Sequence, residues 1–288
     1  MNGQHEKDRQ ITEWELAEVE RANASGRPVV AFVHGLWLLP SSWAGWRTTF
    51  EDAGYATLAP GWPDDPQTRD QAYAHPEVFA GKSVQQVTDH YLAVLSGLRT
   101  KPAVIGHSFG GLIVQKIADA GVAAATVAID NAPIKGVLPL PLSALKSGAP
   151  VLGNPANRKR AVTLTFDQFK YGWANNLDET EARTLYDTYH VPASGLPLFQ
   201  AGLANFTFSK ETAVDVKRPD RGPLLIISGT RDTTAPRAFT HGSYQKQSKN
   251  SDVTEYVEIP GRGHSLIIDR GWPDVAASAL AFVGRFMK

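Results

Sequence analysis

Short runs of apolar, often β-branched residues recur along the chain with helical patterns between them, and this alternation restricts the fold more than any other feature. Four of the runs are almost continuously apolar, as expected for strands that are buried on both faces. Such strands belong to a mostly parallel sheet with helices on both faces, so the sequence predicts an α/β fold with about six or more strands. The predicted strands are Pro28–Gly35, Ala56–Gly61, Pro102–Ser108, Ala125–Asp130, Pro223–Gly229 and Val253–Gly261.

Helical patterns occupy the intervals between most of these strands. Thr12 with Glu15, and Ser83 with Gln86, match the capping box, in which each side chain accepts a hydrogen bond from the backbone N–H of the other residue. The expected helices cover residues 12–24, 41–53, 83–98, 109–120, 236–249 and 273–287. Apolar residues recur at helical spacing in the last of them and predict a face that packs on the core: Val275, Ala279, Phe282, Val283 and Phe286.

The alternation is interrupted between residues 133 and 219, where aromatic residues are frequent and no strand–helix rhythm is clear. We interpret this segment, called the insertion below, as a mainly helical lid placed between the fourth and fifth of the predicted strands. A continuation of the helical core is the alternative. Residues 1–132 and 220–288 would then form the core domain, and a chain of 288 residues suits one domain with such an insertion.

The composition argues against several classes of function. The 29 Lys and Arg residues balance the 29 Asp and Glu residues, so no net charge attracts nucleic acid. The absence of cysteine excludes disulfides, thiolate catalysis and cysteine-ligated metal centres. No motif for a metal or a cofactor is found, and we expect neither. Because the chain has no membrane-spanning apolar run and a polar start, the sequence predicts a soluble cytoplasmic protein.

One motif carries the clearest chemical signal. The segment Gly106-His107-Ser108-Phe109-Gly110-Gly111 follows a predicted strand and precedes a helical run. A serine at such a sharp strand-to-helix turn has a strained backbone, and Gly106 and Gly110 leave room that larger residues would fill. The hydroxyl of Ser108 is then exposed at the carboxyl edge of the sheet, next to a helix N-terminus that favours negative charge.

These residues resemble the nucleophile elbow of the α/β-hydrolase superfamily, in particular of its serine esterases and lactonases. Three further segments resemble motifs of that family: residues 34–37 (HGLW) its oxyanion loop, residues 229–236 (GTRDTTAP) its acid-bearing turn, and residues 261–265 (GRGHS) its histidine loop. Their order along the chain is also that of the family. The resemblance covers residues 28–132 and 220–288 and does not extend to the insertion.

The resemblance implies a catalytic triad. Ser108 is expected to be the nucleophile and His264 the base that accepts its proton. Asp232 is expected to orient the imidazole and stabilise its protonated form. Asp130, at the end of a predicted strand, is the alternative acid, because some members of the superfamily place their acid there.

An oxyanion hole and a substrate pocket are implied as well. The backbone N–H groups of Leu36 and Phe109 are expected to bind the oxyanion. Trp37 and Ile134 are expected to contact the substrate, in an apolar pocket that aromatic residues of the insertion also line. Such a lining favours a neutral, moderately hydrophobic small molecule.

The sequence thus predicts a serine hydrolase of carboxylic esters or lactones that acts through an acyl-enzyme at Ser108, with no cofactor and no nucleic-acid or membrane partner. The alternatives are a noncatalytic ligand-binding protein with a hydrolase fold, a cofactor-free perhydrolase, and an enzyme similar to the hydroxynitrile lyases. Lyase activity in that group requires a lysine near the catalytic histidine, and no lysine stands next to His264.

Overall fold

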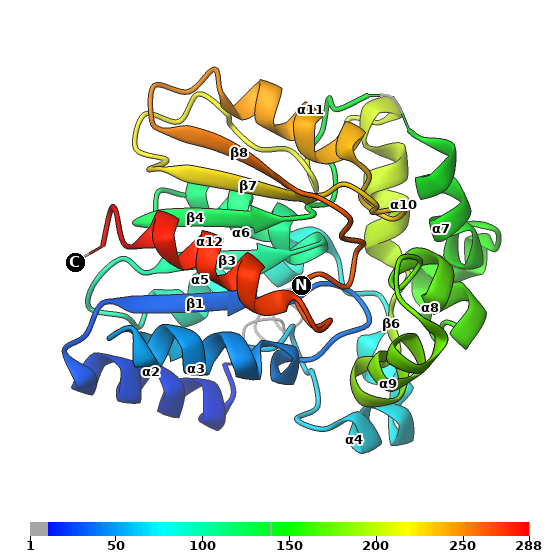
Figure 1. Cartoon of the computed structure of the whole chain (residues 1–288), viewed down its shortest axis with the longest axis horizontal. Coiled ribbons are helices and arrows are strands. Elements are labelled where there is room, and N and C mark those ends of the chain that lie inside the picture. The colour runs from blue at the N-terminus through cyan, green and yellow to red at the C-terminus, as the bar shows by residue number, and fades with distance from the viewer. Residues whose placement is uncertain (1–10, 139, 288) are drawn as a thin grey trace, which may run out of the picture.

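A six-stranded sheet, in which every pair of neighbouring strands is parallel, forms the centre of the molecule (Figure 1). The computed structural model describes residues 11–138 and 140–287. Each strand of this sheet falls inside a predicted range, which confirms the parallel sheet. The strands, in the order in which they lie in the sheet, are β2 (Ala56–Leu58), β1 (Val29–Val33), β3 (Ala103–His107), β4 (Ala125–Ile129), β7 (Leu224–Gly229) and β8 (Thr254–Ile259).

Helices cover both faces of this sheet. In Figure 1, α12 lies in front of the strands and α6 behind them; α3 packs with α12, and α5 packs with α6. Strands β1, β3, β4 and β7 are consequently buried at every position, as their apolar runs predicted. The helices of this core are α2 (Glu13–Ser25), α3 (Ala44–Asp52), α5 (Val84–Leu95), α6 (Phe109–Asp119), α11 (Arg237–Gln247) and α12 (Trp272–Val283).

Capping boxes explain where two of these helices begin, and two departures from the sequence prediction are instructive. The capping boxes at the starts of α2 and α5 are both formed, as predicted. A third box, Thr68 with Gln71, starts α4 (Arg69–Ala74), which the sequence analysis missed. The prediction for Phe286 was wrong: α12 ends at Val283, so Phe286 lies beyond the helix and is 37% exposed.

The insertion forms most of the chain between β4 and β7, and it is mainly helical as expected. In Figure 1 its helices stand together at the carboxyl ends of the strands, on the side to which β1, β3 and β4 point. The division of the chain into a core domain and a lid stays a prediction. Its elements are α7 (Leu142–Leu152), α8 (Phe166–Gly172), α9 (Glu179–Tyr189), α10 (Leu196–Leu203), and a small antiparallel sheet of β5 (Ala161–Val162) and β6 (Ala193–Ser194).

Short 3-10 turns complete the fold. They cover Pro40–Trp43, which leads into α3, Pro76–Phe79, Pro155–Lys159 and Ala204–Phe206. Within the described ranges, no helix combines the length and the apolar character that crossing a bilayer requires.

Candidate active site

Ser108 lies in the turn between β3 and α6, with φ 58° and ψ −121°. A positive φ is unfavourable for a residue with a side chain and persists only where the surroundings impose it. Close backbone packing imposes it here. A Cβ on Gly106 would lie 2.2 Å from the Gly110 carbonyl oxygen, and a Cβ on Gly110 would lie 2.1 Å from the Val33 carbonyl oxygen. The turn therefore needs glycine at both positions, as the motif predicted.

Three side chains from separate loops meet at this turn. The Nε2 atom of His264 lies 3.0 Å from Ser108 Oγ, and its Nδ1 atom lies 2.6 Å from Asp232 Oδ2. The other carboxyl oxygen of Asp232 accepts hydrogen bonds from the backbone N–H groups of Thr234, at 2.6 Å, and Ala235, at 2.8 Å. Since a carboxylate only accepts hydrogen bonds, Nδ1 of His264 carries the proton and Nε2 is left to accept from the serine hydroxyl.

Asp130 lies close to this group but has a different environment. Its Oδ1 atom accepts a hydrogen bond of 2.7 Å from the backbone N–H of Gly229. Complete burial, followed by the charge of the neighbouring Asp232, raises the pKa of Asp130 well above its usual range. This shift favours a neutral carboxyl group, which cannot stabilise a protonated imidazole by its charge. The hydrogen bond to Nδ1 of His264 comes from Asp232.

The loop after β1 passes directly beside the serine. A Cβ on Gly35 would lie 2.7 Å from Ser108 Cβ and 3.3 Å from its Oγ, so the residue before Leu36 lies directly against the serine. Phe109 is the first residue of α6, and its N–H is one of the donors that a helix N-terminus leaves unpaired. Across residues 11–138 and 140–287, no backbone carbonyl accepts a hydrogen bond from either N–H. The expected role of these two N–H groups in binding an oxyanion stays a prediction.

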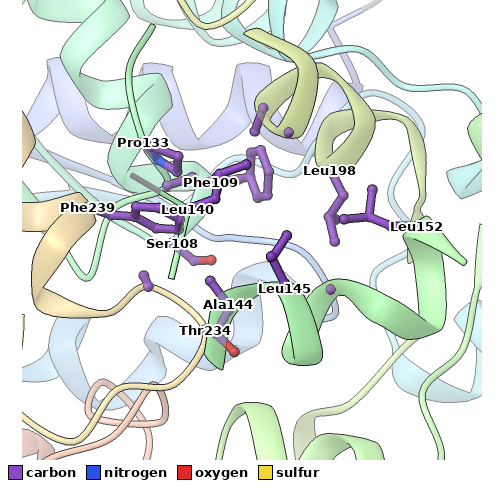
Figure 2. A pocket seen from close by; sticks show the side chains of 15 residues that line it. Ser108, Phe109, Pro133, Leu140, Ala144, Leu145, Leu152, Leu198, Thr234 and Phe239 are labelled. Atoms are coloured by element: carbon purple, nitrogen blue, oxygen red, sulfur yellow. The ribbon is translucent and has the colours of Figure 1, made fainter. Parts of the chain in front are cut away.

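An apolar pocket opens in front of Ser108 (Figure 2). It encloses about 620 Å³ including its mouth, and its lining contains no charged side chain. Two hydroxyl-bearing residues, Ser108 and Thr234, belong to the lining. The large apolar side chains are those of Phe109, Leu140, Leu145, Leu152, Leu198 and Phe239.

The structure places both of the expected substrate-contacting residues outside this lining. Ile134 is 2% exposed and packs in the core, while its neighbour Pro133 reaches the pocket. Trp37 has φ 63°, and its indole N–H donates a hydrogen bond of 3.0 Å to the carbonyl of Val162 in β5. The expected lining is therefore corrected, because the local turn at Trp37 directs its ring towards the insertion.

Several aromatic residues of the insertion form a cluster of their own, and none of them lines the pocket. Phe169 stacks on Trp173 with ring centroids 5.8 Å apart and meets Tyr186 edge-on at 5.4 Å. His190 stacks on Tyr186 at 4.6 Å, and burial lowers its pKa to about 3. His190 is thus a neutral packing residue. The composition indicates that aromatic residues gather in the insertion, but it does not indicate which way the rings point.

Residues of the insertion also hold the loops that carry Asp232 and His264, and the sequence analysis missed them. The ring of Trp173 packs edge-on against the imidazole of His264, with centroids 4.6 Å apart. Asn175 and Asn176 donate side-chain hydrogen bonds to backbone carbonyls of the Asp232 and His264 loops, at 2.9 and 3.0 Å. These partners lie far apart in the sequence, so no local spacing could have revealed them.

A cluster of three candidate metal ligands lies within the described residues. It consists of His107, Asp130 and His264, whose ligand atoms lie within 4.8 Å of one another. Burial, followed by the proximity of His264, lowers the pKa of His107 well below its usual range. Both nitrogens of His264 are already hydrogen-bonded, to Ser108 and Asp232, and an ion here would break one of these bonds. The geometry of these three residues therefore suits buried, closely packed side chains better than a metal centre.

Comparison with known proteins agrees with this architecture. A model of the alpha/beta hydrolase family matches residues 30–278. No curated protein matches the chain. Among solved structures, the monoacylglycerol lipase of Paleococcus ferrophilus is 21% identical, with 91% of this chain and 96% of that chain covered and a TM-score of 0.62.

Two esterases show the same similarity of fold. A thermophilic esterase from Thermogutta terrifontis is 15% identical, with 91% of either chain covered and a TM-score of 0.63. Polyneuridine aldehyde esterase is 15% identical, with 90% of this chain and 99% of that chain covered and a TM-score of 0.61. Identities at this level show a common fold and leave the substrate open. Since the family model spans most of the sequence, the chain belongs to the alpha/beta hydrolase family.

Proposed function

We propose that the protein is a serine hydrolase that cleaves carboxylic esters or lactones of neutral, moderately hydrophobic small molecules. The observation that carries the proposal is the hydrogen-bonded series from Asp232 through His264 to Ser108. In the proposal, the backbone N–H groups of Leu36 and Phe109 serve as donors to the oxyanion. A nucleophile, a base, a group that orients the base and donors for an oxyanion are the components that acyl transfer requires.

In the proposed acylation step, Ser108 Oγ attacks the carbonyl carbon of the ester while its proton passes to His264 Nε2. The N–H groups of Leu36 and Phe109 bind the resulting oxyanion, and Asp232 stabilises the protonated imidazole through Nδ1–H. The bond between the carbonyl carbon and the alcohol oxygen then breaks. The alcohol leaves with the proton from His264, and the acyl group remains on Ser108.

Water reverses these steps in deacylation. It attacks the acyl carbon as one of its protons passes to His264 Nε2, and the same N–H groups bind the second oxyanion. The bond to Ser108 Oγ breaks, and the serine regains its proton from His264. One water molecule is consumed, and a carboxylic acid is released.

The pocket supports the proposed class of substrate. Burying a charged group without a partner is unfavourable, and no charged side chain lines the pocket to pair with one. A neutral substrate with an apolar part therefore fits better than a phosphorylated or zwitterionic one. The hydrogen-bonded series argues against a protein that only binds a ligand, since binding alone does not require it.

Labelling with a fluorophosphonate tests this proposal, because the reagent reacts with an activated serine. The wild-type protein should take up the label at Ser108 and hydrolyse p-nitrophenyl acetate, whereas Ser108→Ala should do neither. Ser96→Ala, at an exposed serine after α5, is the matched control and should behave like the wild type. Labelling at a different residue, or turnover retained by Ser108→Ala, would overturn the proposal.

A further inference from the structure

The pocket in front of Ser108 continues as a slot between two helices of the insertion. From α7 it is lined by Ala144, Gly148 and Leu152, which are four residues apart and so lie on one face of that helix. Helix α10 packs against α7 and lines the slot with Leu198, Ala201 and Gly202. Figure 2 shows Ser108 and Ala144 at one end of this lining and Leu152 and Leu198 at the other.

The width of the slot depends on the small residues of α7. A Cβ on Gly148 would lie 3.2 Å from Leu152 Cδ1 and 3.6 Å from Leu198 Cδ2, so any larger side chain at Gly148 would meet the leucines. Leu152 and Leu198 close the slot beyond this point. The lining is therefore apolar, follows one face of α7 and leaves little room at Gly148.

Helix α7 is tied to the loop that carries Asp232. The hydroxyl groups of Ser147 and Thr234 are hydrogen-bonded to each other, and the Thr234 hydroxyl donates to the carbonyl of Gly172. Thr234 also donates its backbone N–H to Asp232. The wall of the slot is thus held at a defined distance from the reacting groups, which a selection by length requires.

The reaction geometry indicates which part of an ester enters the slot. Ser108 and Phe109 belong to the lining of the pocket, whereas His264 is not among the described residues that line it. The leaving alcohol has to reach His264 Nε2 to receive its proton, whereas the acyl group stays bonded to Ser108. The alcohol therefore departs on the His264 side, and the acyl chain extends into the slot.

We propose, on the basis of the proposed function, that the slot between α7 and α10 selects esters by the length of a straight, saturated acyl chain, with Gly148 as a specificity-determining residue. Four residues of helix span about 6 Å, roughly four to five methylene groups of an extended chain with C–C bonds of about 1.5 Å. Because Leu152 and Leu198 close the slot just beyond Gly148, one turn from Ala144, the slot accommodates roughly four to five carbons beyond Ala144. The substrate class is esters of short- to medium-chain fatty acids.

A series of p-nitrophenyl esters from acetate to palmitate tests this inference. For each variant, kcat/KM is expressed relative to acetate. Wild-type activity should be highest for chains whose end reaches Gly148, roughly four to five carbons beyond the level of Ala144, and should fall for longer chains. The longest acyl chain that Ala144→Phe accepts should be about four to five carbons shorter than the longest chain that Gly148→Phe accepts. The reason is that the two positions are one helical turn apart. Each methylene group that no longer fits lowers kcat/KM relative to acetate about fourfold. About four to five such groups should therefore lower this ratio by about 10²–10³-fold.

Two further variants complete the experiment. Leu152→Ala removes part of the closed end and should shift the optimum to longer chains. The unfolding temperature shows whether each phenylalanine variant folds. If one does not, Leu152→Ala still tests the inference. Leu142→Phe adds an aromatic ring to α7 at a position that is 83% exposed and outside the lining, and it should retain the wild-type profile.

Two sets of outcomes separate this inference from the proposed function. Unchanged chain-length profiles in folded Ala144→Phe, Gly148→Phe and Leu152→Ala would overturn the inference. A shift in a matched series of alkyl acetates, with the acyl series unchanged, would also overturn it, because the alcohol would then occupy the slot. Failure of the wild type to hydrolyse acetate esters, or hydrolysis by Ser108→Ala, would instead overturn the proposed function.

Discussion

Replacing Asp232 by asparagine should lower kcat by about 10³–10⁴-fold, equivalent to about 4–5.5 kcal/mol of transition-state stabilisation. One oxygen of Asp232 accepts from two backbone N–H groups, and the other accepts from Nδ1 of His264. In Asp232→Asn the amide oxygen should stay with the two backbone donors, so the amide NH₂ would face the imidazole. The ring would then have to carry its proton on Nε2, where it cannot accept the proton of Ser108.

Asp130→Asn should change kcat by less than about tenfold, since the raised pKa of Asp130 favours a neutral carboxyl group in the wild type. An asparagine at this position is also neutral. Its amide oxygen can accept from the N–H of Gly229, as Asp130 does, and its NH₂ can donate towards Asp232. Comparing Asp232→Asn with Asp130→Asn thus shows which of the two carboxyl groups supports the imidazole.

Hydrolysis of a p-nitrophenyl ester at one pH near neutrality gives kcat for both variants, and urea unfolding shows whether each remains folded. A larger loss of kcat for Asp130→Asn than for Asp232→Asn would instead identify Asp130 as the acid. A loss of less than tenfold for Asp232→Asn would also contradict the role of Asp232, since the orientation of the imidazole would then not depend on Asp232.

Two stability measurements examine other parts of the structure. Histidine has an ordinary pKa of 6.5, but burial lowers that of folded His190 to about 3, so protons favour the unfolded state as the pH falls through this interval. The free energy of unfolding should thus fall by about 2 kcal/mol between pH 7 and pH 5 through this group, and urea denaturation of His190→Gln should show a smaller fall; equal falls would contradict this assignment. Gly110→Ala should lower the free energy of unfolding by about 1–3 kcal/mol or more, because its Cβ would meet the Val33 carbonyl oxygen at 2.1 Å. Gly202→Ala is the control, whose Cβ would meet nothing within 4 Å, and it should be neutral or stabilising by up to about 1 kcal/mol in thermal unfolding.

Much of the fold was predictable because its signals are local. The buried strands are continuous apolar runs, and two of the predicted helices begin at capping boxes that the structure forms. Phe286 shows the limit of such signals. It continues the apolar spacing of α12, but the helix ends at Val283, and spacing alone does not indicate where a helix stops packing. The box at Thr68 was equally readable, and α4 was missed because a short helix has little apolar periodicity.

The candidate site was predictable to the extent that its parts are turns with their own sequence requirements. Gly106 and Gly110 indicated the strained turn at Ser108, and the motifs around Asp232 and His264 indicated which loops would meet it. The pocket was not predictable in this way. Its walls depend on how α7 and α10 pack on the core, and on the φ of Trp37, which turns a predicted substrate contact towards β5.

The central claim is that Ser108 carries the acyl group during turnover. Wild-type protein mixed with a p-nitrophenyl ester and quenched in acid within the first turnover would show this directly by peptide mass spectrometry. We expect a burst of p-nitrophenol equal to the enzyme concentration, and an acyl group on the peptide that contains Ser108. A stoichiometric adduct on another residue, or ester turnover with neither a burst nor an adduct, would contradict this claim.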